Sequence, residues 1–492
     1  MTPMPSRVLR ILIATLCLGL LGASASGLLY KPTALEGVQQ SGVLRVVTVA
    51  GPATLSHTSD GPTGLEYDLA RAFADYLGVE LDMLVASSKA DVYHALATGS
   101  ADLAAAGLSP SEARNRHFRF TESYLSVEQH VIYRFGQRRP ETVADLAAMD
   151  SADLQIAAYG SQIERLQHLR GDYPELSWNE VASPGTEELL YRVWNREAEL
   201  TVVDSIDLQL TQHFYPELRI AFTLEGARDL VWAFRNGRDD TLYRASGHFF
   251  EQMRNSGRLA QIEERYLGHL GQFDYVGARV FLRHITERLP EYREVFKEAA
   301  ARTGVDWRLL AAIGYQESHW NPRAVSPTGV RGIMMLTLPT AREMGIEDRL
   351  DPVQSIDGGA RYFASLRQRI PERIEEPVRT WLALAAYNVG MGHLEDARRL
   401  TEIRGGDPDT WKDIKDSLPL LSQREWYEQT RFGYARGQEP VTYVAQIRTY
   451  YDLLTRITDP EPGTTLVTVG RPYEPEARRR ALNLAGLLQS TL

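Results

Sequence analysis

The spacing of hydrophobic residues changes about halfway along the chain. In the first half, short apolar runs rich in β-branched residues alternate with segments of helical period. The strand-like runs are Val43–Val49, Leu81–Val85, Val127–Tyr133, Leu154–Ala158 and Leu200–Val203. Helical patterns over 241–255 and 258–266 close this half, and a glycine-punctuated stretch at 267–275 reads as a linker. Alternating strands and helices predict an α/β domain, here over residues 40–270.

Beyond residue 275 the strand pattern largely stops, and apolar residues recur every three or four positions. The helical segments are Val276–Leu282, Tyr292–Arg302, Trp307–Glu317, Pro339–Met344, Ile356–Gln368, Pro377–Tyr387 and Val441–Tyr451. They predict a mainly α domain over residues 276–457. Residues 458–492 contain Pro-Glu-Pro-Gly and the basic cluster Arg478–Arg480, and we expect a flexible tail there. The predicted fold class is therefore multidomain, α/β followed by mainly α.

The N-terminus has the three-part pattern of a secretory signal peptide. Arg7 and Arg10 precede an apolar run, 11–21, and the small residues 23–25 follow it. The run is shorter than the roughly 20 residues that a spanning helix needs. We therefore predict a cleaved signal over residues 1–25 and an exported protein. An uncleaved anchoring segment is the alternative, and lipid attachment at Cys17 is disfavoured because Thr15 and Leu16 precede it.

Composition excludes several classes of partner and cofactor. The net charge of -10 gives no basic footprint for nucleic acid. The single cysteine cannot form an intramolecular disulfide or a thiolate cluster. The 11 histidines lack metal-ligand spacing, and no phosphate-binding glycine loop is present, so we expect neither a metal nor a cofactor.

The densest chemical pattern surrounds Glu317. This residue follows Ile313 and Gly314 by four and three positions, which places it on the apolar face of its helix. Burial would disfavour the ionised carboxylate and raise its pKa, as a proton donor to a glycosidic oxygen requires near neutral pH. A capping or ion-paired glutamate is the structural alternative.

A second carboxylate is missing nearby. Ordinary glycosidases use two carboxyl groups, yet residues 318–341 contain neither Asp nor Glu. This favours a lyase in which Glu317 donates a proton and then accepts one from a hydroxyl of the same sugar. A hydrolytic muramidase is the alternative within the enzymes, and a catalytically dead periplasmic binding or sensor protein is the alternative outside them.

Four segments of the C-terminal half resemble the motifs of the soluble lytic transglycosylase family. They are Glu317-Ser318, the stretch 326–334 with glycines at 329 and 332, the stretch 386–390, and Tyr443-Val444. The resemblance implies a lysozyme-like fold and cleavage of the MurNAc–GlcNAc β-1,4 bond of peptidoglycan to 1,6-anhydro-muramyl ends. It makes Glu317 the acid and base, and it places Ser326, Met335, Tyr387, Asn388 and Tyr443 at the substrate. Met335 stands where many members have Gln, so a hydrogen bond to substrate or to the glutamate is lost there.

The N-terminal half resembles the bacterial extracellular solute-binding proteins for amino acids, whose domain has two lobes. The resemblance rests on a Ser-x-x-Arg element at 111–114, Tyr159-Gly160-Ser161 and Val202-Val203-Asp204. It implies that Arg114 binds a ligand carboxylate, Ser161 lies at a donor-rich helix start and Asp204 faces an amino group. Ordinary ion pairs at Arg114 and Asp204 are the structural alternative.

The order of the two domains is similar to that of one group of membrane-bound lytic murein transglycosylases. It implies that the N-terminal domain binds an amino acid or a muropeptide and modulates cleavage. It also implies a location in the periplasm, peripheral on the outer membrane of a Gram-negative bacterium, with peptidoglycan strands as the main partner.

Overall fold

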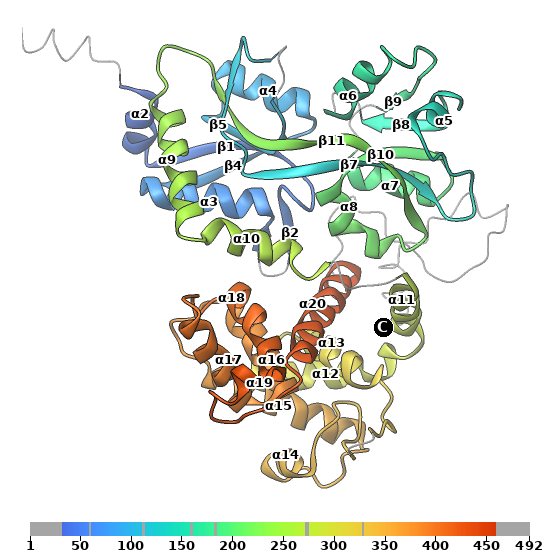
Figure 1. The fold of residues 1–492 in the computed structure, drawn as a ribbon, viewed down its shortest axis with the longest axis vertical. Coiled ribbons are helices and arrows are strands. Elements are labelled where there is room, and N and C mark those ends of the chain that lie inside the picture. The colour runs from blue at the N-terminus through green and yellow to red at the C-terminus, as the bar shows by residue number, and fades with distance from the viewer. Residues whose placement is uncertain are drawn as a thin grey trace, which may run out of the picture.

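The computed structural model describes residues 32–58, 61–110, 114–157, 161–181, 185–270, 275–326 and 329–458. These residues form an α/β domain followed by a helical domain (Figure 1), which confirms the predicted fold class. The predicted signal peptide and nearly all of the predicted tail lie outside the described residues.

One sheet path runs through the whole α/β domain, in the order β4-β1-β5-β11-β7-β10-β8-β9, with β6 paired to β11. Its strands are β1 (Val43–Val49), β4 (Glu80–Ala86), β5 (Leu103–Leu108), β6 (Phe118–Phe120), β7 (Leu125–Arg134), β8 (Leu154–Ala157), β9 (Asn179–Val181), β10 (Leu200–Asp204) and β11 (Leu218–Arg235). A short hairpin, β2 (Ser56–Thr58) and β3 (Gly61–Thr63), stands apart.

Two long strands join two lobes. Parallel strands β4, β1 and β5 form the first lobe, and parallel strands β10, β8 and β9 form the second. The 18-residue β11 pairs antiparallel with β5 near its C-terminal end and with β7 along most of its length. Figure 1 shows β7 and β11 running from one lobe to the other. Each lobe therefore has its own core.

Helices cover both lobes. Those of the first lobe are α2 (Ala34–Ser41), α3 (Leu65–Leu77), α4 (Lys89–Thr98), α9 (Thr241–Asn255) and α10 (Arg258–Leu267). Those of the second are α5 (Val143–Ala147), α6 (Ser161–Leu169), α7 (Thr186–Trp194), α8 (Ser205–Thr211) and the 3-10 turn η1 (Gln212–Phe214). In the first lobe, Trp232 and Phe73 are fully buried at the centre of an aromatic cluster.

The C-terminal domain packs its helices around one large core. They are α11 (Tyr275–Glu287), α12 (Leu289–Thr303), α13 (Trp307–Ser318), α14 (Leu338–Glu343), α15 (Pro352–Arg369), α16 (Val378–Val389), α17 (Met391–Ile403), α18 (Trp411–Ser417), η3 (Leu418–Ser422), α19 (Arg424–Tyr427) and α20 (Gln438–Thr458). Helix α13 is central because it is buried on nearly every side and packs against α20, α12 and α15.

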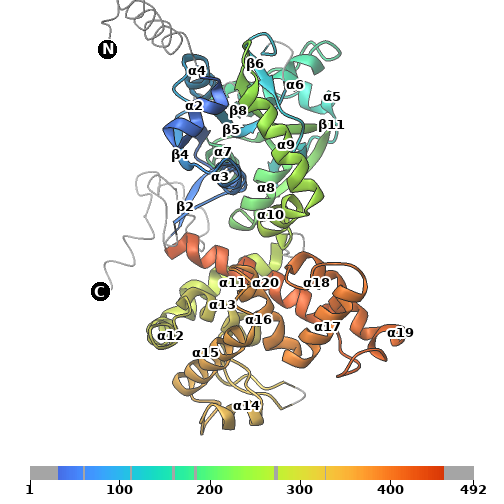
Figure 2. The same cartoon turned by 90° about the vertical axis from the view of Figure 1, so that its left-hand side faces the viewer.

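Helix α20 lies at the junction of the two domains in both views (Figures 1 and 2). Its buried Arg448 donates to the carbonyl oxygens of Glu264 and Arg265, at 3.0 and 2.6 Å, at the end of α10. The Arg448 guanidinium also lies 3.8 Å from the ring centroid of Trp381. One turn further on, Asp452 is hydrogen bonded to Nε2 of His269 at 2.8 Å. Because Arg448 lies at the C-terminus of α10, its positive charge also complements the dipole of that helix. Both the hydrogen bonds and the dipole therefore favour the Arg448 contact.

Most predicted elements match the structure within a few residues. The sequence patterns missed β11, because its exposed middle interrupts the apolar alternation, and they missed β5, whose run of alanines carries little strand preference. They also missed the 13-residue α17 and the 7-residue α18, in which charged residues interrupt the apolar pattern.

Candidate active site

Glu317 lies in the last turn of α13 and is only partly exposed. The neighbouring α13 residues Ile313 and Gly314 are fully buried, as the sequence pattern predicts. Burial removes water from the carboxyl group and raises the pKa of Glu317 to about 7.

One hydrogen bond opposes that shift. The hydroxyl of Tyr443 on α20 donates to Oε1 of Glu317 at 2.6 Å, which favours the carboxylate and lowers the pKa. Neither of the two causes is a second charged group. At near-neutral pH the carboxyl group therefore exists in both protonation states, as a group that must donate and then accept a proton requires.

Tyrosines form a stack beside this pair. The ring of Tyr387 stacks on Tyr443 with centroids 6.5 Å apart, and Tyr362 packs on the other side of Tyr387 at 5.3 Å. The Tyr387 hydroxyl donates to the carbonyl oxygen of Met334 at 2.9 Å. The stack thus fixes Tyr443 and joins α15, α16 and α20 to the loop that follows α13.

The chain turns sharply after Glu317. His319 and Trp320 both have positive φ, 52° and 54°. The indole N–H of Trp320 donates to the carbonyl oxygen of Ala311 at 2.8 Å, and the Ser318 hydroxyl donates to that of Ile333 at 2.8 Å. A left-handed pair of non-glycine residues is costly, so these bonds hold the turn that ends the helix.

Close approaches of backbone shape the loop over 329–336. At Gly332, with φ of 87°, an added Cβ would lie 1.8 Å from the carbonyl oxygen of Arg349. The Arg349 guanidinium donates to the carbonyl oxygens of Gly329 and Leu336. Glycine is therefore required at position 332 for two reasons: the backbone of Arg349 leaves no room for a Cβ, and the positive φ favours glycine.

The other predicted substrate residues differ in exposure and in local structure. Met335 is half-buried with a positive φ of 47°. Asn388 is exposed at the end of α16. The Ser326 hydroxyl accepts a hydrogen bond from the N–H of Val330 at 3.2 Å, so it shapes its own turn. Contact of these three residues with a sugar stays a prediction.

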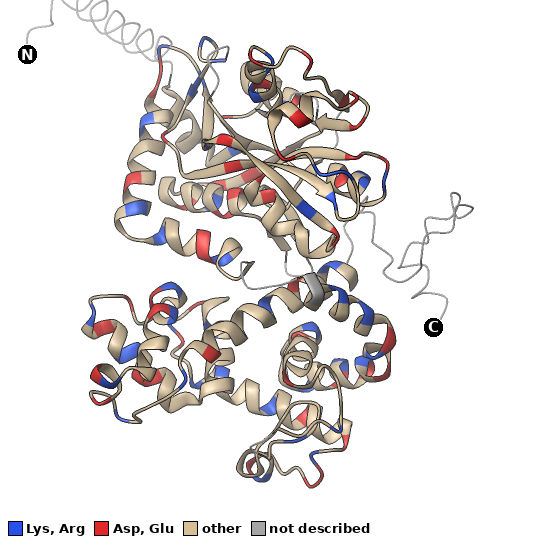
Figure 3. Ribbon diagram, turned by 45° about the vertical axis from the view of Figure 1, so that its right-hand side comes forward, with Lys and Arg blue, Asp and Glu red and all other residues tan. Residues whose placement is uncertain are grey.

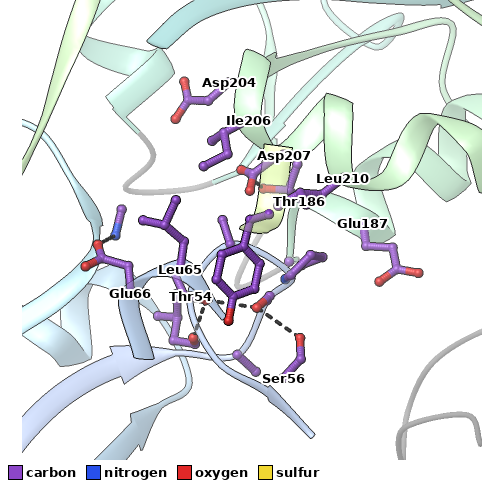
Figure 4. A pocket seen from close by; sticks show the side chains of 18 of the residues that line it. Thr54, Ser56, Leu65, Glu66, Thr186, Glu187, Asp204, Ile206, Asp207 and Leu210 are labelled. Carbon is purple, nitrogen blue, oxygen red and sulfur yellow. Dashed lines mark hydrogen bonds between the residues drawn. The ribbon is translucent and has the colours of Figure 1, made fainter. Parts of the chain in front are cut away.

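A separate cavity of about 1070 Å³ extends from the cleft between the two lobes toward α20. Figure 4 shows Thr54 and Glu66 from the first lobe on one side and Asp204 and Asp207 from the second lobe on another. Glu66 is buried and accepts hydrogen bonds from Tyr124, Trp232 and the N–H of Gly107.

Charges of both signs meet in this cavity. Lys89 at the start of α4 donates to the carbonyl oxygen of Gly107 at 3.0 Å, and burial lowers its pKa. Burial, and then the charge of Asp204, raise the pKa of Asp207 to about 6. A cation and a carboxyl group on facing walls suit a small ligand that itself carries both charges.

Two of the predicted ligand residues of this domain, Asp204 and Arg114, have partners within the protein. Asp204 accepts hydrogen bonds from Gln129 at 3.0 Å and from Arg228 at 3.2 Å. Arg114 forms an ion pair with Glu164 at 3.0 Å. Ser161 is the first residue of α6, and Asp204 lines the cavity whereas Arg114 is outside its described lining. The sequence reasoning passed over Lys89, Asp207 and Glu66, and only the position of Asp207 one turn after Asp204 could have indicated one of them.

Charges elsewhere are mixed. Figure 3 shows acidic and basic residues interspersed over the elements of both domains. Within the part of the chain that the structure describes, no cluster of three or more His, Cys, Asp or Glu residues could hold a metal ion. None of the described helices has both the length and the apolar character needed to cross a membrane.

Two family profiles match the chain. The profile described as bacterial extracellular solute-binding proteins, family 3, matches residues 44–269, and that described as transglycosylase SLT domain matches residues 294–409. The chain is 54% identical to membrane-bound lytic murein transglycosylase F 1 of Alkalilimnicola ehrlichii over 89% of this chain and 88% of the relative. It is 48% identical to membrane-bound lytic murein transglycosylase F of Stutzerimonas stutzeri over 88% of each chain.

Solved structures resemble the N-terminal domain. A mutant of ArgBP from T. maritima aligns with a TM-score of 0.43 at 20% identity, covering 48% of this chain and 99% of that one. The ancestral amino acid-binding protein AncCDT-1 aligns with a TM-score of 0.42 at 21% identity, covering 48% of this chain and 100% of that one.

Replacing Gly332 tests the loop geometry. We expect Gly332→Ala to lower the free energy of unfolding by about 3 kcal/mol or more, because the new methyl group clashes with backbone and the residue keeps a positive φ. Gly345→Ala is the matched control: it also has positive φ, 66°, but its Cβ meets nothing within 4 Å. We expect that change to cost about 1 kcal/mol. Equal losses in urea unfolding would contradict the close approach at Gly332.

Proposed function

The chain belongs to the family of membrane-bound lytic murein transglycosylases F, and we propose that Glu317 performs its reaction alone, first as acid and then as base. The enzyme is a peptidoglycan lytic transglycosylase with an N-terminal solute-binding domain. The observation that carries the proposal is the buried carboxyl group of Glu317, whose pKa of about 7 is set by burial and by Tyr443.

The proposed reaction needs no water. Protonated Glu317 gives its proton to the glycosidic oxygen of the MurNAc–GlcNAc β-1,4 bond, and the bond from that oxygen to C1 of MurNAc breaks. The C6 hydroxyl oxygen of the same MurNAc then forms a bond to C1, and the Glu317 carboxylate takes up the hydroxyl proton. The products are a 1,6-anhydro-MurNAc end and a free GlcNAc hydroxyl, and Glu317 is protonated again.

Two features support this single-residue cycle. Residues 318–341, which include the loop beside Glu317, contain no second carboxylate to activate water or to form a covalent intermediate. The Tyr443 hydroxyl stabilises the carboxylate without supplying a full charge, so it lowers the cost of giving up the proton while leaving the group able to take one back.

We further propose that the N-terminal cleft binds an amino acid or a muropeptide and modulates cleavage. The support is helix α20, which contacts Glu317 through Tyr443 and the N-terminal domain through Arg448 and Asp452. Beyond these residues, Arg456 forms an ion pair with Glu187 of α7, in the second lobe. A ligand that moved the second lobe would therefore act on the helix that carries Tyr443.

The proposed location is the periplasm, with peripheral attachment to the outer membrane. The two relatives described above are named membrane-bound, and the sequence pattern of residues 1–25 is that of an export signal.

Product analysis tests the reaction. We expect wild-type enzyme to release 1,6-anhydro-muropeptides from purified sacculi and Glu317→Gln to lower the rate by at least about 100-fold, since an amide can neither donate nor accept the proton. The exposed Glu372→Gln is the matched control and should keep full activity. If mass spectrometry finds reducing MurNAc ends instead, the enzyme is a hydrolytic muramidase and the proposed lyase reaction is wrong. Full activity of Glu317→Gln would show that Glu317 takes no part in the mechanism.

Calorimetry tests the ligand. We expect the full chain to bind a muropeptide or an L-amino acid in isothermal titration, and Asp204→Asn to weaken that binding at least about tenfold, since a ligand amino group loses its carboxylate partner in the cavity. The exposed Asp172→Asn is the matched control and should bind like wild type. If none of these compounds gives heat with the wild-type chain, the proposed ligand class is wrong.

A further inference from the structure

Two exposed aromatic side chains stand on the segment between α19 and α20. Phe432 and Tyr434 are 52% and 59% exposed, and we name the pair the aromatic ledge. Exposure of large apolar side chains to water is unfavourable, and where such side chains cluster they commonly mark a binding surface. The question is what this pair would contact.

The backbone beneath the ledge is held rigidly. Asp396 of α17 is 3% exposed, and its carboxylate accepts hydrogen bonds from the N–H groups of Arg431 and Phe432, at 3.0 and 2.8 Å. The N–H of Ala435 donates to the carbonyl oxygen of Leu421 in η3 at 3.0 Å. The buried carboxylate binds two backbone N–H groups and so fixes the segment, while the two rings stay in solvent. The ledge is therefore preorganised for contact.

Each ring is also positioned from the side. A Cβ added at Gly392 would lie 2.9 Å from Cγ of Phe432, so that glycine makes room for the ring. The edge of His393 meets Phe432 with centroids 6.1 Å apart. Tyr434 packs edge to face against Tyr427 at 5.8 Å. Helices α17 and α19, which flank the ledge, lie close together in Figures 1 and 2, and both pack on η3.

The ledge lies a short distance from the active site. Gly392 follows the exposed Asn388 by four residues, across the break between α16 and α17 at Gly390. Four residues span at most about 14 Å even when extended, and Asn388 follows Tyr387 of the tyrosine stack beside Glu317. A polymer bound across Glu317 and Asn388 would reach the ledge within a few sugar units.

We propose that the aromatic ledge is a glycan subsite of the enzyme, on which a sugar remote from the cleaved bond stacks. The inference rests on the proposed reaction at Glu317. The flat rings of Phe432 and Tyr434 suit the apolar face of a pyranose, and the Tyr434 hydroxyl suits its hydroxyl rim. A rigid pair contacts the strand with little loss of conformational entropy. The ledge acts on strand binding and leaves proton transfer unchanged.

Kinetics on glycan strands of different length test the subsite. In the full chain, Phe432→Ala with Tyr434→Ala should raise KM for long peptidoglycan strands about tenfold and change kcat less than twofold. A substrate with only one sugar on either side of the cleaved MurNAc–GlcNAc bond, too short to reach the ledge, should lose nothing. Phe135→Ala, which removes a 63% exposed ring from the N-terminal domain, is the matched control. Unchanged KM for long strands, or an equal loss with short ones, would overturn the subsite.

Binding without turnover separates this proposal from the reaction mechanism. Sedimentation with sacculi in the Glu317→Gln background should show weaker binding of the ledge variant, whether or not Glu317 is the acid. Phe432→Leu, which keeps apolar bulk beside Gly392 but loses the flat face, distinguishes stacking from folding. It should unfold at the wild-type temperature and raise KM several-fold, and wild-type KM would contradict the proposal.

Discussion

The hydrogen bond from Tyr443 to Glu317, at 2.6 Å, is the interaction on which the catalytic domain depends. It joins the end of α13 to the first turns of α20, and it counteracts the rise in the pKa of Glu317 that burial causes. With full burial and no donor, the carboxyl group would hold its proton too tightly to serve as acid, and in open water it would be ionised. The tyrosine stack, the strained turn at His319 and Trp320, and the close contact at Gly332 all hold the groups around this pair.

Helix α20 also contacts the N-terminal domain. Its early residues face Glu317, whereas Arg448, Asp452 and Arg456 face the N-terminal domain. Arg448 is buried, and its positive charge is stabilised by two carbonyl groups at the end of α10 and by the Trp381 ring. Because a buried cation cannot leave these partners without a large cost, the position of α20 is tied to the N-terminal domain.

Sequence patterns predicted the parts of this structure that local chemistry determines. The helix of Glu317 follows from its apolar spacing, and the inward position of the carboxyl group follows from Ile313 and Gly314. Other contacts depend on how β7 and β11 bring the two lobes together, and no local sequence pattern encodes that arrangement. They include the ion pair of Arg114 with Glu164 and the position of Lys89 near Asp207. The aromatic ledge was likewise hidden, because its rigidity comes from Asp396, which lies 36 residues before Phe432.

The central claim is that burial and one hydrogen bond keep the Glu317 carboxyl group half protonated near neutral pH. The most direct measurement is a ¹³C NMR titration of the side-chain carboxyl carbon of Glu317 in the full chain, with Glu317→Gln used to assign the signal. The account predicts a pKa of about 7 in the wild type and a higher value in Tyr443→Phe, since the hydroxyl that stabilises the carboxylate is gone. Titration of Glu317 near 4.5, the ordinary value for a glutamate, with no change in Tyr443→Phe, would contradict it.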